Sequence, residues 1–375
     1  MIYKTFADCK LSALGMGAMR FPRTESGEVD IAATTEMVDY AIANGVNYFD
    51  TAWGYHNGKS ELIIGEVLAK RYPREKFYLA DKFPGYSLEN VAKIGEIFPR
   101  QLEKCGVDYF DFYLYHNVCD LDIDWYLDPK YGIHDYLMQA KKEGRIRHLG
   151  FSEHATLDTV KRFLAAYGKD MEFCQIQLNY LDYDFQDAKA KLALLAEWNI
   201  PVWVMEPLRG GKLATLTPED TARLAALRPE ETVPGWAFRF LQTIPQVTVT
   251  LSGMSSFTQV AENIATFSEE KPLVQAEWDT LMDVAREMTR RIVISCTGCR
   301  YCTTGCPAGL DIPHLLELYN KHVFTSGVIH PAALLHLPEE KHPTACIGCG
   351  KCEDACPQNI SVSEVLADFV RRMKK

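Results

Sequence analysis

The stretch VNYFDTAWGYHNGKSELIIGEVLAKR, residues 46–71, decides the fold. It opens with VNYFD, a short apolar run that predicts a β-strand. Polar and glycine residues follow, and SELIIGEVLAKR then places apolar residues at helical spacing. One strand followed by one helix is the repeating unit of α/β proteins, so the rest of the chain can be searched for further copies.

Further strand-like segments recur along the chain, with helical stretches between them. The eight candidates are residues 11–19, 46–50, 76–82, 109–116, 146–152, 173–180, 200–207 and 247–253. Eight such units in about 290 residues predict a (β/α)8 TIM barrel. A doubly wound open sheet is the alternative. That fold normally carries GxGxxG after its first strand, and GMGAMR matches it only in part.

The composition changes after the helical stretch 276–292. From Cys296 on, cysteine and proline replace the strand–helix rhythm, and C-x2-C-x2-C-x3-C-P occurs twice, beginning at Cys296 and at Cys346. We therefore predict two domains. Residues 1–292 form the barrel, and residues 293–375 form a small, helix-rich domain.

The spacing of this motif is typical of [4Fe–4S] clusters. Three closely spaced thiolates bind one cluster, and the fourth reaches the other cluster. Zinc is the alternative, but zinc sites typically show paired CxxC units without a third nearby cysteine. The motif resembles that of ferredoxins with two [4Fe–4S] clusters. The predicted sets are Cys296, Cys299, Cys302 and Cys356 for one cluster, and Cys346, Cys349, Cys352 and Cys306 for the other.

Four polar residues stand where predicted barrel strands end, the edge at which barrels carry their active sites. They are Asp50, Tyr55, Lys82 and His116. Each alone has an ordinary structural explanation, but four at successive strand ends favour catalysis. We expect Asp50 to position Lys82, and the Lys82 ammonium to lower the pKa of Tyr55. Tyr55 would then protonate a carbonyl oxygen that His116 orients, while a hydride reaches the carbon.

FDTAWGYHNGKSELIIGEVL, together with the later DK and YLYHN, resembles the signature of the aldo-keto reductase family. The resemblance covers roughly residues 1–290 and implies that barrel fold, the same catalytic tetrad and a nicotinamide cofactor bound without a Rossmann motif. Combined with two ferredoxin motifs, it resembles a bacterial and archaeal group of these reductases that carries a C-terminal iron–sulfur domain.

The resemblance also implies cofactor contacts near the last four strands. They are Ser152, Gln175, Met205, Leu208, Gly211, Lys212, Gly253, Ser255, Ser256, Gln259, Glu262 and Asn263. Four positions depart from the family pattern. Glu153 replaces an amide, Met205 an aromatic, and Gln259 and Gly253 two basic residues. These departures weaken the expectation of NADP, so the cofactor is NAD(P)H by resemblance or FMN as an alternative.

Electron counting bears on this choice, because a hydride carries two electrons and a cluster accepts one. A flavin could bridge the two. The leading hypothesis is an oxidoreductase acting on a carbonyl-type substrate, with electrons relayed through two [4Fe–4S] clusters. One alternative is an electron-transfer protein in which the barrel binds a flavin or partner and the tetrad is idle. The other is an ordinary NAD(P)H carbonyl reductase with structural clusters.

The overall composition limits the partners. The formal net charge is -10 and the only basic run is a short one at the C-terminus, so neither nucleic acid nor an anionic membrane is expected. No signal peptide or bilayer-spanning apolar stretch stands out, which predicts a cytoplasmic protein. In that reducing compartment clustered cysteines indicate metal. The expected partner is a small-molecule substrate, and an external ferredoxin or other redox protein is a further candidate.

Overall fold

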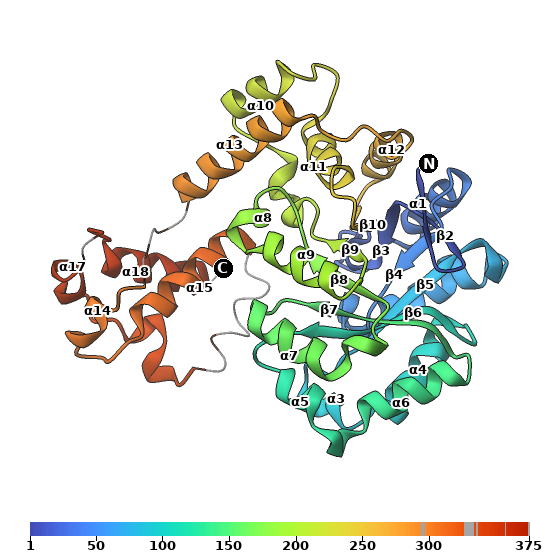
Figure 1. Cartoon of the computed structure of the whole chain (residues 1–375), viewed down its shortest axis with the longest axis horizontal. Coiled ribbons are helices and arrows are strands. Elements are labelled where there is room, and N and C mark those ends of the chain that lie inside the picture. The colour runs from blue at the N-terminus through green and yellow to red at the C-terminus, as the bar shows by residue number, and fades with distance from the viewer. Residues whose placement is uncertain are drawn as a thin grey trace. The chain divides into compact units, whose positions relative to one another are not determined.

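The computed structural model describes residues 1–292, 294, 296, 298–325, 334, 337–356 and 358–373. Eight parallel strands form a closed barrel in which β10 pairs with β3 (Figure 1). The strands are β3 (Leu14–Gly17), β4 (Tyr48–Asp50), β5 (Tyr78–Phe83), β6 (Phe110–Val118), β7 (Ile146–Glu153), β8 (Phe173–Gln177), β9 (Val202–Met205) and β10 (Val247–Ser252). The predicted (β/α)8 barrel is confirmed, and each strand overlaps one of the predicted segments, although β5, β6 and β7 end one or two residues later than predicted.

The strands are rich in apolar residues because both faces are largely buried, as expected for an all-parallel sheet. Every residue of β4 and β8 is buried. Helices and single turns connect the strands. They are α1 (Ile31–Ala43), α2 (Ser60–Ile64), α3 (Leu88–Val91), α4 (Ile94–Cys105), α5 (Ile123–Leu127), α6 (Ile133–Lys142), α7 (Leu157–Tyr167), α8 (Asp182–Phe185), α9 (Ala188–Glu197), η7 (Arg209–Ala214), α10 (Pro218–Ala225), α11 (Val233–Gln242), α12 (Phe257–Thr266) and α13 (Gln275–Ile292).

An antiparallel hairpin that the sequence did not predict precedes the barrel. It consists of β1 (Tyr3–Phe6) and β2 (Cys9–Ser12). The Phe6 ring lies 5.0 Å from the Trp203 ring and 5.8 Å from the Phe112 ring. Both partners stand near the amino ends of their strands, so the hairpin covers the end of the barrel opposite the predicted active site.

The cysteine-rich part repeats its structure as well as its sequence. The elements are α14 (Tyr301–Thr304), α15 (Ile312–Thr325), α17 (Lys351–Asp354) and α18 (Val362–Met373). The starts of α14 and α15 each lie 50 residues before those of α17 and α18. Left-handed backbone recurs at the same interval, at Gly298 and Gly348 and again at Arg300 and Gly350. The helix-rich domain is therefore built from two copies of one loop–helix unit.

The chain divides into two compact units. One contains residues 1–208 and 224–278, and the other contains residues 209–223 and 279–375. The second unit thus takes in a segment from within the predicted barrel domain. The predicted boundary itself, residue 293, lies outside the described residues and stays a prediction.

Among the helices of the described residues, none has the length and apolar character that crossing a bilayer requires.

Candidate functional site

Asp50, Tyr55 and Lys82 meet at the carboxyl ends of β4 and β5. Lys82 Nζ donates to Asp50 Oδ1 at 2.5 Å and to Thr51 O at 2.7 Å, and it lies 3.5 Å from the Tyr55 hydroxyl oxygen. Asp50 pairs with Ala80 in the sheet, and Lys82 lies two residues further on. Because strand side chains alternate between faces, this register turns Lys82 to the same side as Asp50. The barrel thus brings these three predicted residues together.

The acid–base balance of this group differs from the expectation. Burial raises the pKa of Tyr55, and the Lys82 ammonium opposes that rise without cancelling it. The prediction that Lys82 brings the pKa of Tyr55 down is therefore wrong for the net shift, because desolvation of the phenolate outweighs the nearby charge. Burial also lowers the pKa of Lys82, but Asp50 and Tyr55 outweigh it and raise the pKa overall. Lys82 stays an ammonium and Tyr55 keeps its proton at neutral pH.

His116 lies in β6 beside this group. Its ring stands edge-on to the Tyr55 ring, with centroids 6.0 Å apart, and to the Tyr86 ring at 5.1 Å. Tyr126 fixes its backbone by donating its hydroxyl to His116 O at 2.6 Å. Burial, followed by the charge of Lys82, holds the pKa of His116 well below its usual value. Within the described residues the buried Nδ1 atom makes no hydrogen bond. A neutral imidazole next to the tyrosine can hydrogen-bond a substrate oxygen.

The buried side-chain amide of Gln101 fixes the backbone of Lys82. Gln101 Nε2 donates to Lys82 O at 3.0 Å, and Gln101 Oε1 accepts the Tyr113 hydroxyl at 2.5 Å. Gln101 comes from α4, so helix and barrel are tied together at the lysine. Sequence reasoning missed Gln101 and Tyr86, because neither carries a strand-end signal.

The departure at Glu153 has a structural explanation. Glu153 is buried, and its Oε2 accepts Lys191 Nζ at 2.9 Å and Ala155 N at 2.8 Å. It is thus held in an ion pair with α9. Its neighbour Ser152 is also engaged, since its Oγ accepts Asn117 N at 2.8 Å.

Gln175 and Met205 lie at the same end of the barrel, on β8 and at the end of β9. Gln175 is 3% exposed, and within the described residues its Oε1 atom has no hydrogen-bond partner. A buried, unpaired acceptor is costly, so such an atom is suited to a ligand's N–H donor. Met205 is partly exposed and offers a flexible apolar side chain.

The residues after β10 cap a helix. Ser256 is the N-cap of α12 and its Oγ accepts Gln259 N, while Gln259 Oε1 accepts Ser255 N at 2.7 Å. This pair resembles a capping box, except that Gln259 accepts from the residue before the N-cap. It accounts for a glutamine where the family pattern often has a basic residue.

Two further predicted contacts on α12 differ in burial. Asn263 is buried and donates Nδ2 to Ser252 Oγ at 3.1 Å. Glu262 is exposed, and its backbone oxygen accepts the Thr266 hydroxyl at 3.1 Å. Only Glu262 of the two therefore presents its side chain to solvent.

Arg20 supplies a cation that sequence reasoning missed. Its side-chain carbons would lie 3.1 Å from a Cβ on Gly253, so the arginine packs directly over that glycine. Its guanidinium pairs with Glu206 at 3.7 Å, and its carbonyl accepts the Ser255 hydroxyl at 2.8 Å. The cation missing at Gly253 is thus replaced by one from the turn after β3. The only sequence signal is an arginine just beyond the first barrel strand.

The loop after β9 spans both compact units. Leu208 ends a stretch of the first unit, whereas Gly211 and Lys212 belong to the second. Gly211 has a φ of 93°, which favours glycine. Lys212 Nζ donates to Val323 O near the end of α15. Burial, with help from Arg209, lowers the pKa of Lys212 to about 8.

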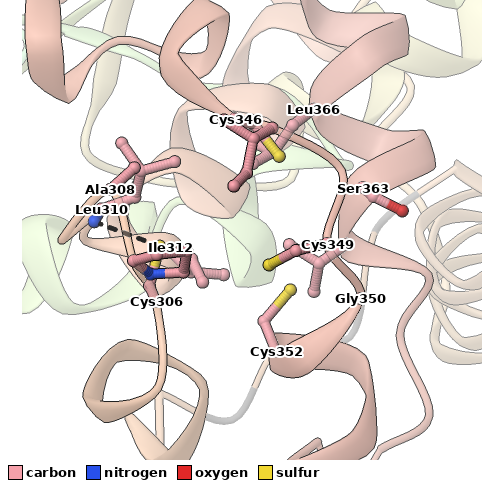
Figure 2. A pocket seen from close by; sticks show the side chains of 13 residues that line it. Cys306, Ala308, Leu310, Ile312, Cys346, Cys349, Gly350, Cys352, Ser363 and Leu366 are labelled. Atoms are coloured by element: carbon pink, nitrogen blue, oxygen red, sulfur yellow. Dashed lines mark hydrogen bonds between the residues drawn. The ribbon is translucent and has the colours of Figure 1, made fainter.

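The eight clustered cysteines line two pockets, which we name by their first motif cysteines. The Cys346 pocket is lined by Cys306, Cys346, Cys349 and Cys352, and the Cys296 pocket by Cys296, Cys299, Cys302 and Cys356. Each pocket takes three cysteines from one motif and the fourth from the other. Figure 2 shows the cysteines of the Cys346 pocket and the hydrogen bond from Leu310 N to Cys306 Sγ, 3.5 Å long.

The remaining lining of the two pockets differs in polarity. Leu310 and Leu366 are among the apolar residues of the Cys346 pocket. The Cys296 pocket includes Arg300 and Gln358. Gly298 N donates to Cys296 Sγ at 3.5 Å. Amide donors and charges beside cluster sulfurs are the groups by which proteins set cluster potentials.

Fold and site define the class: this is a (β/α)8 barrel protein with an aspartate, tyrosine, lysine and histidine group at the barrel mouth. The aldo/keto reductase family profile matches residues 13–286, and the chain belongs to that family. A 4Fe–4S dicluster domain profile matches residues 295–360. The chain is therefore an aldo-keto reductase barrel followed by an iron–sulfur domain.

Curated relatives resemble the barrel. A probable aldo-keto reductase 1 of Glycine max is 29% identical over 164 residues, covering 41% of this chain and 44% of that protein. The chain thus matches less than half of that relative's length. An NADH-specific methylglyoxal reductase of Escherichia coli is 27% identical over 232 residues, covering 57% of this chain and 68% of that protein.

Solved structures agree on the fold. The holo form of aldo-keto reductase AKR11C1 from Bacillus halodurans superposes with a TM-score of 0.60 at 25% identity, covering 76% of this chain and 96% of that one. A Klebsiella pneumoniae aldo-keto reductase in complex with NADPH gives 0.60 at 19% identity, with the same coverage, and shows only that the fold is shared.

Proposed function

We propose that this protein reduces or oxidises a carbonyl-type substrate at the barrel mouth, with electrons relayed through two [4Fe–4S] clusters. The observation that carries the proposal is the coexistence of two four-cysteine pockets and an assembled Asp50, Tyr55, Lys82 and His116 group in one chain. The domain boundary near residue 293 is part of this proposal.

The cysteine pockets fit cuboidal clusters. Each offers four thiol groups, the number that a [4Fe–4S] cluster requires. The proposed ligands are those that line each pocket, with Cys306 and Cys356 crossing to the pocket of the other motif. Zinc would also accept four thiolates, but the shared fourth cysteine favours iron–sulfur clusters.

The tetrad residues then have distinct roles. Tyr55 holds a proton at neutral pH and delivers it to the developing alkoxide, a much stronger base than a phenolate. Lys82 stabilises the phenolate that remains, and Asp50 holds Lys82 in place through the 2.5 Å ion pair. His116 is neutral and orients the carbonyl oxygen. In oxidation the same groups run in reverse.

A nicotinamide or a flavin would supply the hydride chemistry when bound. The unpaired Gln175 Oε1 suits the amide donor of a nicotinamide, and Arg20 offers a cation beside the Gly253 turn. We propose NAD(P)H on these grounds. FMN is the second candidate, because Glu153 is locked to Lys191 and offers no amide. A flavin would also accept two electrons as a hydride and pass them one at a time to the clusters.

Electron paramagnetic resonance during turnover tests the relay. Anaerobic protein with intact clusters is mixed with a reduced ferredoxin as one-electron donor and a carbonyl substrate such as methylglyoxal, with NADP, NAD or FMN present, and frozen at intervals. We expect the reduced-cluster signals to rise and fall with turnover. Clusters that stay in one redox state while product forms would contradict the relay and favour structural clusters.

A Tyr55→Phe variant serves as the matched control. We expect it to abolish substrate-dependent oxidation or reduction of the clusters while leaving their iron content intact. Mass spectrometry of the released small molecules identifies the organic cofactor. Retained FMN supports the flavin, and a nucleotide requirement without bound flavin supports NAD(P)H.

A further inference from the structure

A second cluster of reactive side chains lies at the opposite end of the barrel. Asp8 stands in the turn of the β1–β2 hairpin, Cys9 opens β2, and His148 lies near the start of β7. Cys9 Sγ is 3.6 Å from His148 Nε2 and 3.6 Å from Asp8 Oδ1, and His148 Nε2 is 3.6 Å from Asp8 Oδ1. A carboxylate oxygen, a sulfur and an imidazole nitrogen therefore form an equilateral triangle.

In His148 and Asp8, the polar atom that lies outside the triangle is already bonded to another residue. His148 Nδ1 contacts Glu172 Oε2 at 2.9 Å, which leaves Nε2 for the triangle. Asp8 Oδ2 accepts Arg147 at 2.9 Å, which leaves Oδ1. Glu172 is itself fixed, since its Oε1 accepts Leu149 N at 3.0 Å. Carboxylates that orient a histidine in this way are the usual outer partners of metal-binding histidines.

We propose that Asp8, Cys9 and His148 bind a zinc ion. An ion at the centre of a tetrahedron whose base is three atoms 3.6 Å apart lies about 2.2 Å from each, within zinc's bond lengths of about 2.0–2.3 Å to oxygen, nitrogen and sulfur. The mixed thiolate, imidazole and carboxylate set favours zinc over magnesium or calcium, which prefer oxygen ligands alone.

Burial and access also suit an ion. Cys9 is 1% exposed and His148 7% exposed, whereas the Asp8 side chain is 68% exposed. The ion would be anchored from inside the barrel and enter from the solvent side. Three protein ligands leave one tetrahedral position for water. The bound ion would tie the hairpin to β7, which gives it a structural role far from the tetrad.

The test uses the full-length protein with its clusters intact. It is incubated anaerobically with zinc sulfate, desalted, and examined by elemental analysis and zinc K-edge X-ray absorption. We expect about one zinc per chain, with one sulfur at about 2.3 Å and nitrogen or oxygen ligands at about 2.0–2.2 Å. Zinc surrounded by sulfur alone would place the ion in a cluster pocket and overturn the proposal, as would wild-type protein that retains no zinc.

Variants separate binding from folding. Cys9→Ala and His148→Ala are expected to lose the zinc, whereas Cys174→Ala, which alters a buried cysteine of β8, should keep it. Glu172→Gln leaves all three ligands in place, and we expect it to weaken zinc binding about 10–100-fold. If a ligand variant fails to fold, the zinc affinity of Glu172→Gln is the test of the proposed site. Unchanged affinity in that variant would contradict the orienting carboxylate and with it the site.

Discussion

At the scale of single residues, Tyr55 carries the chemistry. It has a cation on one side, at 3.5 Å, and a neutral imidazole on the other. Burial raises the pKa of Tyr55 more than the nearby lysine lowers it, so the Tyr55 hydroxyl is protonated before the reaction. Lys82 therefore acts by stabilising the phenolate once the proton has left.

Replacing Tyr55 by phenylalanine removes the proton donor and keeps the ring. We expect kcat for carbonyl reduction to fall about 10²–10⁴-fold, the usual contribution of a general acid, with the cluster absorbance unchanged. Steady-state kinetics measure the effect. Tyr86→Phe is the matched control, because Tyr86 also contacts the His116 ring. An equal loss in both variants would remove Tyr55 from the donor role.

His154, just beyond β7, predicts a pH dependence of stability. Burial, followed by the charge of Lys191, lowers the pKa of His154 to about 4 from its ordinary value of 6.5. Between those values the unfolded chain binds a proton that the native chain does not. The free energy of unfolding therefore falls as the pH drops from 7 towards 4. We expect His154 to account for a loss of about 2 kcal/mol at pH 5.

Urea unfolding followed by tryptophan fluorescence measures this, because all six tryptophans lie within residues 1–278. His154→Gln should reduce the loss between pH 7 and pH 5, and His314→Gln, at a partly exposed position on α15, should not. If wild type and His154→Gln lose the same stability, the buried neutral histidine is not the cause.

At the scale of elements, the duplicated loop–helix unit exchanges one cysteine between its copies. The short helices α14 and α17 each carry the third cysteine of a motif, and the fourth follows shortly after the helix. That fourth side chain lines the pocket of the other motif. Each cluster would thereby join two segments about 50 residues apart.

Paired cysteine variants test this exchange. Cys306→Ala and Cys349→Ala should perturb the same electron paramagnetic resonance signal, and Cys302→Ala and Cys356→Ala the other one. Each variant should lose up to about half of the iron, since one pocket of two is damaged. Cys306→Ala and Cys302→Ala perturbing one common signal would mean that each motif binds its own cluster.

At the scale of the whole molecule, the chain enters its second compact unit twice. The segment 209–223 leaves the barrel sequence and packs with residues 279–375. Lys212 donates to Val323 within that unit. The second compact unit thus contains more of the chain than the cysteine motifs alone.

Truncation after residue 292 should expose this segment. Arg209, Lys212 and Arg223 are trypsin sites inside it. Truncation removes α15, which packs against η7 and accepts the Lys212 hydrogen bond, so we expect cleavage at Arg209 and Lys212 to be at least about 10-fold faster than in the full-length protein. Arg223 keeps its ion pair with Glu287 and should change less. Mass spectrometry of the early fragments measures the rates, with cleavage at exposed Lys93 as the internal control. Equal rates in the two proteins would show that the segment needs no partner from residues 293–375.

The sequence by itself determined the barrel, the iron–sulfur domain and the candidate catalytic residues. Strand and helix periodicity and the C-x2-C-x2-C-x3-C-P spacing are local patterns, and a closed parallel barrel places all strand ends at one mouth. Asp50, Lys82 and His116 were therefore readable from their places at strand ends.

Tertiary structure alone decided the rest. Closure of the barrel places Arg20 over Gly253 and Cys9 beside His148, a pair 139 residues apart in the chain. No local pattern links such residues. Burial likewise sets the raised pKa of Tyr55 and the neutral state of His116, because desolvation depends on everything packed around a group. Periodicity reports which residues face inward, whereas their neighbours and their access to water exist only once the strands have closed.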